Sequence, residues 1–150
     1  MSPKVVIVDL DGTLAINAHR FYLIDKKRGK PNWEEYFLAC DKDKPNIPVI
    51  KSIRALKKSG YVIHIFSARG KVAFDATVQW LEKHQVPFDL LTMREVGDFT
   101  PDEELKQQWL LAKYPNYKDD ILCVFDDRYK VVEMWRSLGL SCFQVAPGNF

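Results

Sequence analysis

The sequence predicts an α/β fold in which helices cover both faces of a central parallel sheet. Two observations carry this prediction. Short runs rich in β-branched residues alternate with longer amphipathic stretches along the 150 residues, which is the pattern of β-α-β units. Several of the short runs are apolar almost throughout, as strands buried on both faces require. Since β-α-β crossovers are right-handed, a three-layer sandwich follows.

Five strands and four main helices account for most of the chain. The strands are expected at residues 4–9, 61–67, 88–93, 121–126 and 141–145. The helices are expected at residues 48–59, 71–85, 101–114 and 128–138. Each helix ends close to a residue that commonly terminates helices, namely Gly60, Pro87, Pro115 and Gly139.

Residues 15–44 do not fit this alternation. They lie between the first strand and its helix, and they are too many for an ordinary β-α connection. We interpret them as a small cap inserted after the first strand, with a short helix at residues 33–38 and a basic loop at residues 26–30. The whole chain, residues 1–150, is predicted to be one domain.

Composition and charge exclude several classes of protein. A chain that is 47% hydrophobic and 28% charged fits a globular protein and is unlike disordered, collagen-like or coiled-coil sequences. The formal net charge of +2 is too small to indicate a nucleic-acid-binding protein by itself. Apolar runs are too short to span a membrane and the N-terminus shows no signal-peptide pattern, so a cytoplasmic location is expected. The three cysteines lack metal-site spacing, which predicts neither a disulfide framework nor a zinc site.

Polar residues follow three of the predicted strands. They are Asp9, Asp11 and Thr13 after the first strand, Ser67 and Arg69 after the second, and Asp126 and Asp127 at the end of the fourth. Because ligands of such folds bind where the carboxyl ends of parallel strands meet, these side chains are expected to lie together. Carboxylates gathered at one edge repel one another unless a cation lies among them. Mg²⁺ is the expected ion, since it prefers carboxylate and water oxygens.

Asp9 and Asp11 are separated by one residue, so their side chains share one face of an extended chain. One can attack a phosphorus atom while the other moves a proton. As a nucleophile, Asp9 would form an aspartyl-phosphate, and Asp11 would protonate the leaving group and later deprotonate water. Taken alone, the Asp11-Gly12 pair is equally consistent with a turn after a strand.

The other candidates have simpler explanations when taken singly. Ser67 and Arg69 precede the helix expected at residues 71–85, where a hydroxyl, a planar guanidinium and free backbone amides can hold a phosphate. They can also be a helix cap and a solvated arginine. Lys106 can be ordinary helix surface, and the Asp126-Asp127 pair can cap the helix that follows it.

The order of these residues resembles the haloacid dehalogenase (HAD) superfamily of phosphotransferases. The shared features are D-x-D-G-T, a strand-terminal serine, a lysine and an Asp-Asp pair, in that order along the chain. The resemblance implies a HAD-like Rossmannoid fold with a five-stranded parallel sheet. It also implies a role for each residue: Asp9 as nucleophile, Asp11 as acid/base, Thr13 and Ser67 orienting the phosphate, Lys106 neutralising it, and Asp126 and Asp127 joining Asp9 and the Asp11 backbone carbonyl around Mg²⁺.

Over residues 4–150 the chain is more specifically similar to the 3′-phosphatase domain of bacteriophage-type polynucleotide kinase/phosphatase. The C-terminal residues carry this similarity: Asp126-Asp127-Arg128, Val131-Val132-Glu133-Met134-Trp135-Arg136, Gln144-Val145-Ala146 and Gly148. Asp41, Asp43 and Arg94 also fall where that family places functional or neighbouring residues. The resemblance implies that Arg20 and Arg69 bind the substrate phosphate and that Asp102, one helical turn before Lys106, orients it.

The resemblance implies a Mg²⁺-dependent phosphomonoesterase acting on nucleic-acid 3′-phosphate ends or nucleoside 3′-monophosphates in nucleic-acid repair. It implies a possible kinase or ligase partner, no membrane, and the host cytoplasm if the gene belongs to a phage. Ala68 stands where the family usually has glycine, and no phosphate-binding loop of the G-x-x-x-x-G-K-[ST] type is present, so no kinase activity is assigned. A phosphatase of small nucleotides and a non-catalytic end-binding module are the alternatives.

The cap has two interpretations. Its basic loop and Arg20 could follow a nucleic-acid backbone while Tyr22, Trp33 or Tyr36 stacks on a base. Alternatively, the lysines are solvated and Trp33 packs with Tyr36 and Phe37 in a small core of the cap. The other tryptophans, Trp80, Trp109 and Trp135, are expected to pack against the sheet.

Overall fold

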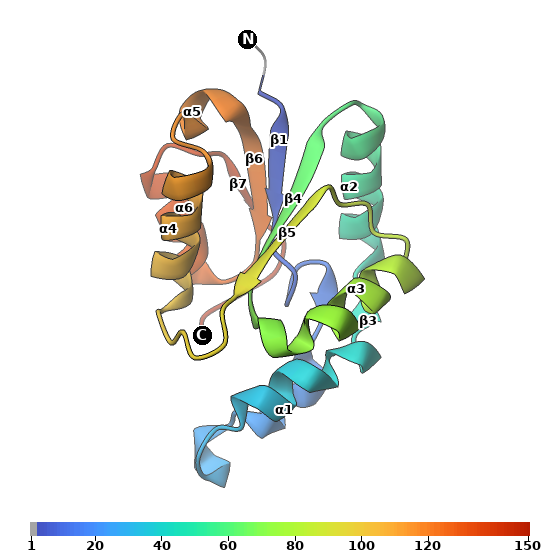
Figure 1. The fold of residues 1–150 in the computed structure, drawn as a ribbon, viewed down its shortest axis with the longest axis vertical. Coiled ribbons are helices and arrows are strands. Elements are labelled where there is room, and N and C mark those ends of the chain that lie inside the picture. Colours follow the sequence, from blue (N-terminus) through green and yellow to red (C-terminus); the bar gives the residue numbers. More distant parts are fainter. Residues whose placement is uncertain (1–2) are drawn as a thin grey trace.

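A computed structural model describes residues 3–150 (Figure 1). Its main sheet has five strands in the order β5-β4-β1-β6-β7, and every neighbouring pair is parallel. The α/β prediction is therefore confirmed. The strands are β1 (Val5–Val8), β4 (Val62–Gly70), β5 (Leu90–Arg94), β6 (Ile121–Asp126) and β7 (Cys142–Gln144).

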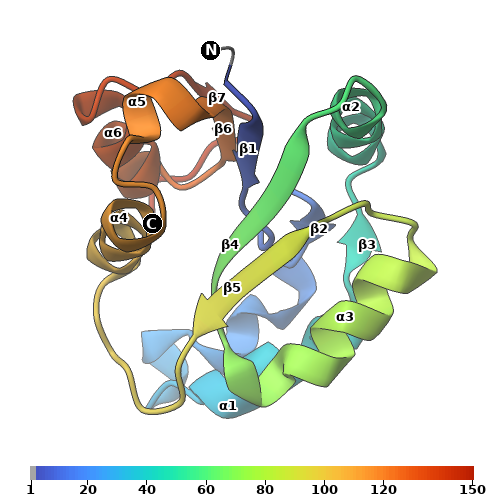
Figure 2. The same cartoon turned by 45° about the horizontal axis from the view of Figure 1, so that its top comes forward.

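Helices cover both faces of this sheet, with α2 and α3 on one side and α4 and α6 on the other (Figures 1 and 2). The central strand β1 shows why, because its side chains alternate between two cores. Val6 and Val8 pack in the core that holds Ile50 of α2. Ile7 packs in the core that holds Trp135. The helices are α2 (Ile47–Lys58), α3 (Phe74–Lys83), α4 (Asp102–Lys113), α5 (Tyr117–Asp120) and α6 (Tyr129–Ser137).

The cap lies beyond the carboxyl ends of the strands (Figure 1). It contains the antiparallel pair β2 (Ala15–Ile16) and β3 (Lys44–Pro45), the helix α1 (Trp33–Leu38), and 3₁₀ helices at Ala18–Leu23, Lys26–Arg28 and Ala39–Lys42. The helix expected at residues 33–38 is present with those bounds. The residues expected to form a basic loop include the second of these 3₁₀ helices.

The structure corrects the boundary between the second strand and its helix. The strand β4 continues to Gly70, three residues past Ser67, and a register shift lets Gly70 pair with Arg94. The helical segment then starts as a 3₁₀ turn at Lys71–Ala73 before α3 begins at Phe74. Ser67 consequently lies inside the strand, and no helix N-terminus adjoins it.

The buried residues agree with the expected packing of the tryptophans. Trp80 and Trp135 are buried, and Trp109 packs against the second core. Cys40, Cys123 and Cys142 are all buried and free. Among the described residues, no helix combines the length and apolar character that a membrane crossing demands.

Candidate active site

Three buried carboxylates meet at the carboxyl edge of the sheet. Asp9 directly follows β1, Asp126 ends β6, and Asp127 follows it. The two strands are neighbours, with Val8 paired to Phe125, so both chains leave the sheet at the same place. Asp9, Asp126 and Asp127 each offer an oxygen, and these oxygens lie within 4.8 Å of one another.

Lys106 comes from α4 and points into this group. Its Nζ donates to Asp9 Oδ1 at 2.8 Å and to Asp126 Oδ2 at 3.0 Å. The residue is only 2% exposed, so the explanation of Lys106 as solvated surface is wrong. Burial alone would lower the pKa of Lys106, but the carboxylates of Asp126 and Asp9 raise it above its ordinary value. The ammonium is therefore a permanent charge in the site.

The D-x-D-G-T turn places the Thr13 hydroxyl beside Asp9 and leaves room at Gly12 for the side chain of Asp127. Thr13 Oγ1 donates to Asp9 Oδ2 at 3.0 Å. Gly12 has a φ of +83°, and a Cβ atom there would lie 2.1 Å from Asp127 Oδ2. Near the C-terminus, a Cβ atom on Gly148 would lie 2.2 Å from the backbone oxygen of Asp127. Glycine is required at both positions for Asp127 to occupy its place.

The carboxylate cluster, defined as Asp9, Asp126, Asp127 and Lys106, has an uncompensated negative charge. Burial raises the pKa of Asp9 well above its usual range, and Asp126 raises it further. Burial likewise raises the pKa of Asp127 to about 6. Three carboxylates against one ammonium fit a hard divalent cation, which binds oxygen ligands of this kind.

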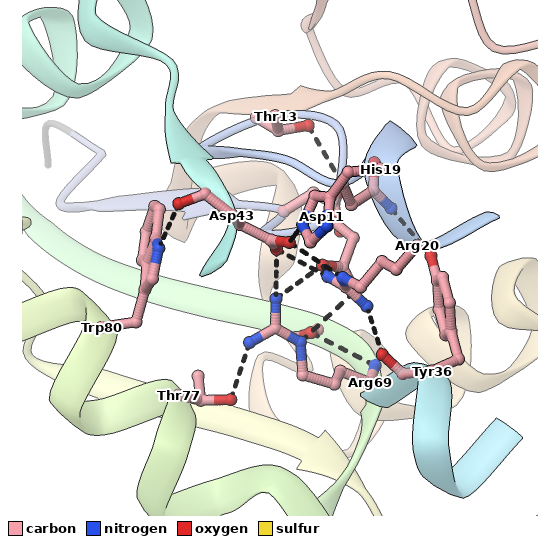
Figure 3. A network of polar contacts seen from close by, with 12 residues as sticks. Asp11, Thr13, His19, Arg20, Tyr36, Asp43, Arg69, Thr77 and Trp80 are labelled. Carbon is pink, nitrogen blue, oxygen red and sulfur yellow. Dashed lines mark hydrogen bonds and ion pairs between the residues drawn. The ribbon is translucent and has the colours of Figure 1, made fainter. Parts of the chain in front are cut away.

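A second cluster surrounds Asp11, whose side chain points toward Arg20 and Arg69 (Figure 3). Asp11 Oδ1 accepts from Arg20 Nη2 at 2.5 Å and from Arg69 Nη2 at 2.6 Å. Both arginines are buried, at 0% and 2% exposure. Although burial alone would raise it, the guanidiniums of Arg69 and Arg20 hold the pKa of Asp11 at about 2. Asp11 is therefore ionised in this structure.

Asp43, at the end of the cap, completes this arginine cluster, defined as Asp11, Arg20, Arg69 and Asp43. Its carboxylate accepts from Arg20 Nε at 2.9 Å and Nη2 at 2.6 Å, and it lies 3.5 Å from Arg69 Nη2. Its backbone oxygen accepts from Trp80 Nε1 at 2.8 Å, which ties the cap to α3 (Figure 3). The charges of the two carboxylates and the two guanidiniums cancel, so the arginine cluster has no net charge.

Comparison with known proteins agrees with this geometry. The family model of the polynucleotide kinase PNKP phosphatase domain matches residues 3–150. The chain belongs to the PNKP phosphatase-domain family. It is accordingly a phosphatase domain of the HAD superfamily that resembles domains of nucleic-acid repair proteins.

Relatives of this PNKP-family domain are longer proteins. A protein of Autographa californica nuclear polyhedrosis virus, named as a bifunctional polynucleotide kinase/RNA ligase, is 32% identical over 142 residues, which are 91% of this chain and 18% of that protein. A chain in the structure of the Pnkp1/Rnl/Hen1 RNA repair complex is 35% identical with a TM-score of 0.80, over 99% of this chain and 44% of that chain. The domain thus spans less than half the length of each.

A more distant structure shares the fold alone. It is a haloacid dehalogenase-like family hydrolase from Streptococcus pneumoniae, 16% identical with a TM-score of 0.64. The match covers 95% of this PNKP-family domain and 84% of that chain. The fold is therefore shared over most of the length of both chains.

Two residues that the resemblance places in the site make hydrogen bonds within the chain of this PNKP-family domain. Within the described residues, Asp102 makes no hydrogen bond to Lys106; it accepts from Arg94 Nη2 and Arg128 Nη1, both at 2.7 Å. Its charge still raises the pKa of Lys106 from a greater distance. Ser67 Oγ accepts from the Arg69 backbone amide at 3.2 Å. The Asp102 carboxylate therefore pairs with two arginines, which form stronger charged hydrogen bonds, in place of Lys106 on its own helix.

Sequence reasoning assigned no site role to Trp135. Its Nε1 donates to Asp126 Oδ2 at 3.2 Å, so a core residue orients a site carboxylate. Asp43 was noted only by resemblance, and its contacts span 23 residues of the chain to Arg20. The spacing of Trp135 after Asp126 on the following helix was the available signal, but the same spacing also fits simple core packing.

The site opens into a cleft of about 790 Å³. Its floor includes Asp9, Asp11, Lys106, Asp126 and Asp127. Its walls come from the cap and from the loop between β5 and α4. This volume is in the range of small-molecule and cofactor sites.

Proposed function

We propose that this domain is a Mg²⁺-dependent phosphomonoesterase that removes 3′-phosphates from nucleic-acid ends through an aspartyl-phosphate on Asp9. The observation that carries the proposal is the position of Asp9. It belongs to the carboxylate cluster with Lys106, yet it is one residue away from Asp11 and its two arginines. A phosphate ester at Asp9 would therefore lie between a cation site and a pair of guanidiniums.

The side chains of Asp9, Asp126 and Asp127, with the backbone carbonyl of Asp11, would hold Mg²⁺. When bound, the ion would neutralise charge on the phosphoryl oxygens. Lys106 would add a second positive charge close to the nucleophile. The raised pKa of Asp9 and of Asp127 in the absence of a cation supports this assignment.

The chemistry divides into two displacements. An Asp9 oxygen attacks phosphorus, the bond from phosphorus to the 3′-oxygen breaks, and the leaving oxygen takes a proton from Asp11. A water then attacks the aspartyl-phosphate, Asp11 takes its proton, and inorganic phosphate leaves while the Asp9 carboxylate is restored. Each proton that Asp11 gives in the first step is recovered in the second.

This role requires a change around Asp11. With Arg20 and Arg69 donating to it, Asp11 has a pKa of about 2 and carries no proton to give. A substrate phosphate is a stronger acceptor for guanidinium groups than a single carboxylate oxygen, because it offers several anionic oxygens. Transfer of the arginine donors to the substrate would release Asp11 and raise its pKa. Arg20 and Arg69 would thus bind the substrate phosphate and control the protonation of Asp11.

The substrate assignment rests on the family and on its relatives. The matching family is a polynucleotide kinase phosphatase domain, and the two closer relatives are named for polynucleotide kinase, RNA ligase or RNA repair. We extend these to this chain as a nucleic-acid substrate and a kinase or ligase partner. The 3′-end as the reacting group and the cytoplasm as location are carried over from the sequence-based prediction. Nucleoside 3′-monophosphates carry the same ester and are included.

An oligonucleotide phosphorylated at either end tests the proposal. We expect Mg²⁺-dependent release of phosphate from the 3′-phosphorylated oligonucleotide and much slower release from the 5′ form. Asp9→Asn should reduce turnover to background, whereas Asp75→Asn, an exposed aspartate on α3, should leave it unchanged. A preference for the 5′ ester or for free 5′-nucleotides would replace the proposed substrate. Absence of phosphatase activity in the unmodified protein would favour a non-catalytic end-binding module.

A further inference from the structure

The loop between β5 and α4 presents two apolar side chains to solvent. Val96 is 77% exposed and Phe99 is 87% exposed, the largest values among the described large hydrophobic residues. A single exposed apolar side chain is ordinary. These two lie three residues apart on one loop, and both line the cleft that contains the carboxylate cluster. Their exposure is therefore concentrated where a substrate would bind.

The backbone of this loop is firmly held. Arg94 Nη1 donates to the backbone oxygens of Asp98 at 2.9 Å and Thr100 at 2.7 Å, and its Nε donates to the Ala68 oxygen at 2.9 Å. Asp98 Oδ1 accepts from the amide of Thr100 at 3.0 Å and from its hydroxyl at 2.7 Å. The ring of Phe99 is thus presented by an ordered backbone, which lowers the entropy cost of binding against it.

The cap contributes a second exposed aromatic ring to the same cleft. Trp33, the first residue of α1, is 48% exposed. Tyr36 packs edge-on to it at 5.7 Å and Phe37 lies at 5.9 Å, so the indole is held in place. Figure 2 shows the loop after β5 descending beside the cap. Flat apolar surfaces therefore come from both the loop and the cap.

Acidic residues are the sequence neighbours of these rings in the cleft lining. They are Glu34, Glu95, Asp98 and Glu103, whereas the basic residues of the lining are Arg69, Arg94, Lys106, Arg128 and Lys130. Glu95 is paired with Lys71, and no salt bridge occupies the other three acidic residues within the described residues. An anionic phosphate is therefore less favoured beside these acidic residues than at the guanidinium and ammonium groups, whereas a neutral aromatic heterocycle can contact the apolar ring faces.

We propose that Phe99 stacks on the base of the nucleoside that carries the phosphate, and that Trp33 provides the second aromatic face. The inference rests on the proposed function and adds the specificity-determining residue for the terminal nucleoside. Stacking accepts every base because each has a π-face. The domain should consequently require a base at the terminal position without selecting its identity.

Two matched substrates test this inference. One oligonucleotide ends in a nucleoside 3′-phosphate, and the other has the same sequence but ends in an abasic sugar 3′-phosphate. For the unmodified protein we expect kcat/KM to favour the first by roughly tenfold, which is the usual scale of base-aromatic stacking. Phe99→Ala should reduce the ratio to near one through loss on the base-bearing substrate, and Phe99→Trp should keep it.

The control is Phe74→Ala, because Phe74 is 42% exposed on α3 and is not among the described residues that line the cleft. This variant should keep the ratio of the unmodified protein. A ratio near one for the unmodified protein would overturn the inference. So would a Phe99→Ala variant that loses equal activity on both substrates, since that pattern indicates a structural role for the loop.

A binding measurement separates this inference from the proposed reaction. Trp33 is the tryptophan with the largest described exposure, so its fluorescence should be quenched by adenosine 3′-monophosphate but not by inorganic phosphate, in the Asp9→Asn protein with Mg²⁺. Trp33→Phe should remove the quenching, and Phe99→Ala should weaken it. Quenching without any hydrolysis of 3′-phosphate ends would retain the base site and reject the proposed reaction. Absence of quenching, with a substrate ratio near one, would reject the base site alone.

Discussion

The two charged clusters at the sheet edge have different net charges, although Asp9 and Asp11 are separated by only one residue. The carboxylate cluster sets three carboxylates against Lys106, and burial raises the pKa of Asp9 and of Asp127. The arginine cluster sets two carboxylates against two guanidiniums, and the pKa of Asp11 falls to about 2. The first cluster keeps a net negative charge, whereas the charges of the second cancel until an anion competes for its arginines. One chain segment therefore supplies both halves of the proposed phosphate-ester site.

The sharpest way to separate the clusters is Asp11→Asn. Because only the side chain of Asp11 moves the proton, turnover should fall by about 10²–10⁴-fold. Stabilisation of the protein by Mg²⁺ should remain, since the Asp11 side chain faces the arginines. Steady-state rates and thermal unfolding with and without Mg²⁺ measure both effects. Loss of the Mg²⁺ effect in this variant would mean that the clusters act as one.

Removal of Asp43 should show that the arginine cluster supports the fold. Asp43→Ala leaves Arg20 buried with fewer acceptors, and breaking a buried ion pair from one side costs about 3–5 kcal/mol. The midpoint of urea unfolding reports this loss. Asp41→Ala changes an exposed aspartate in the 3₁₀ helix that ends just before Asp43, and it should cost far less. Equal losses in the two variants would contradict a structural role for the cluster.

Mg²⁺ should stabilise the carboxylate cluster by mass action. At a free concentration one hundred times its Kd, the ion should raise the free energy of unfolding by about 2.7 kcal/mol. Asp127→Asn should remove most of this gain, while the exposed control Asp75→Asn should keep it. Urea unfolding in Mg²⁺ and in chelator gives the comparison. Full stabilisation of the Asp127→Asn variant would place the ion elsewhere.

The two clusters should also respond to pH with opposite signs. Asp11 has a folded-state pKa of about 2 against an ordinary 3.8, so it contributes about 2 kcal/mol above pH 4 that is lost as the pH falls toward 2. Asp127 has a folded-state pKa of about 6 against 3.8, so without Mg²⁺ it reduces stability as the pH rises from 4 to 6. Chelated protein unfolded in urea across this range measures both effects.

Variants are needed to isolate these effects, because His64 acts in the same pH range. Burial lowers its pKa to about 4, so His64 adds stability as the pH rises through that range. As the pH rises from 4 to 6, the free energy of unfolding of Asp127→Asn should increase relative to that of the unmodified protein. As the pH falls from 4 to 2, the difference by which Asp11→Asn is less stable than the unmodified protein should shrink. Differences that do not vary with pH would contradict both pKa assignments.

The sequence predicted the elements better than their ends. Residues 121–126 and 33–38 form a strand and a helix with the expected bounds, because apolar runs and caps are local signals. The end of β4 was misplaced by three residues, since it depends on how Gly70 pairs with Arg94 of another strand. Strand register is a long-range property that a single segment does not contain.

The same distinction applies to the site. The meeting of Asp9, Asp126 and Asp127 follows from parallel strands that end at one edge, so it was expected from the order of elements. The pairing of Asp11 with Arg20 and Arg69 joins residues 9 and 58 positions apart and depends on how the cap folds back. Likewise, Asp102 pairs with Arg94 and Arg128 because of the loop geometry. Which of several possible partners a charged side chain pairs with follows only from the three-dimensional structure.

The indole of Trp135 connects the hydrophobic core to the carboxylate cluster. It fills the core beneath β6 and, through one hydrogen bond at 3.2 Å, fixes the orientation of an Asp126 oxygen. A replacement of Trp135 would therefore change the orientation of Asp126, and with it the proposed cation site, while every residue in the cleft stays the same. If the proposed cation binds there, laboratory evolution of this scaffold has a route to new ion selectivity that begins behind the sheet, out of reach of any substrate.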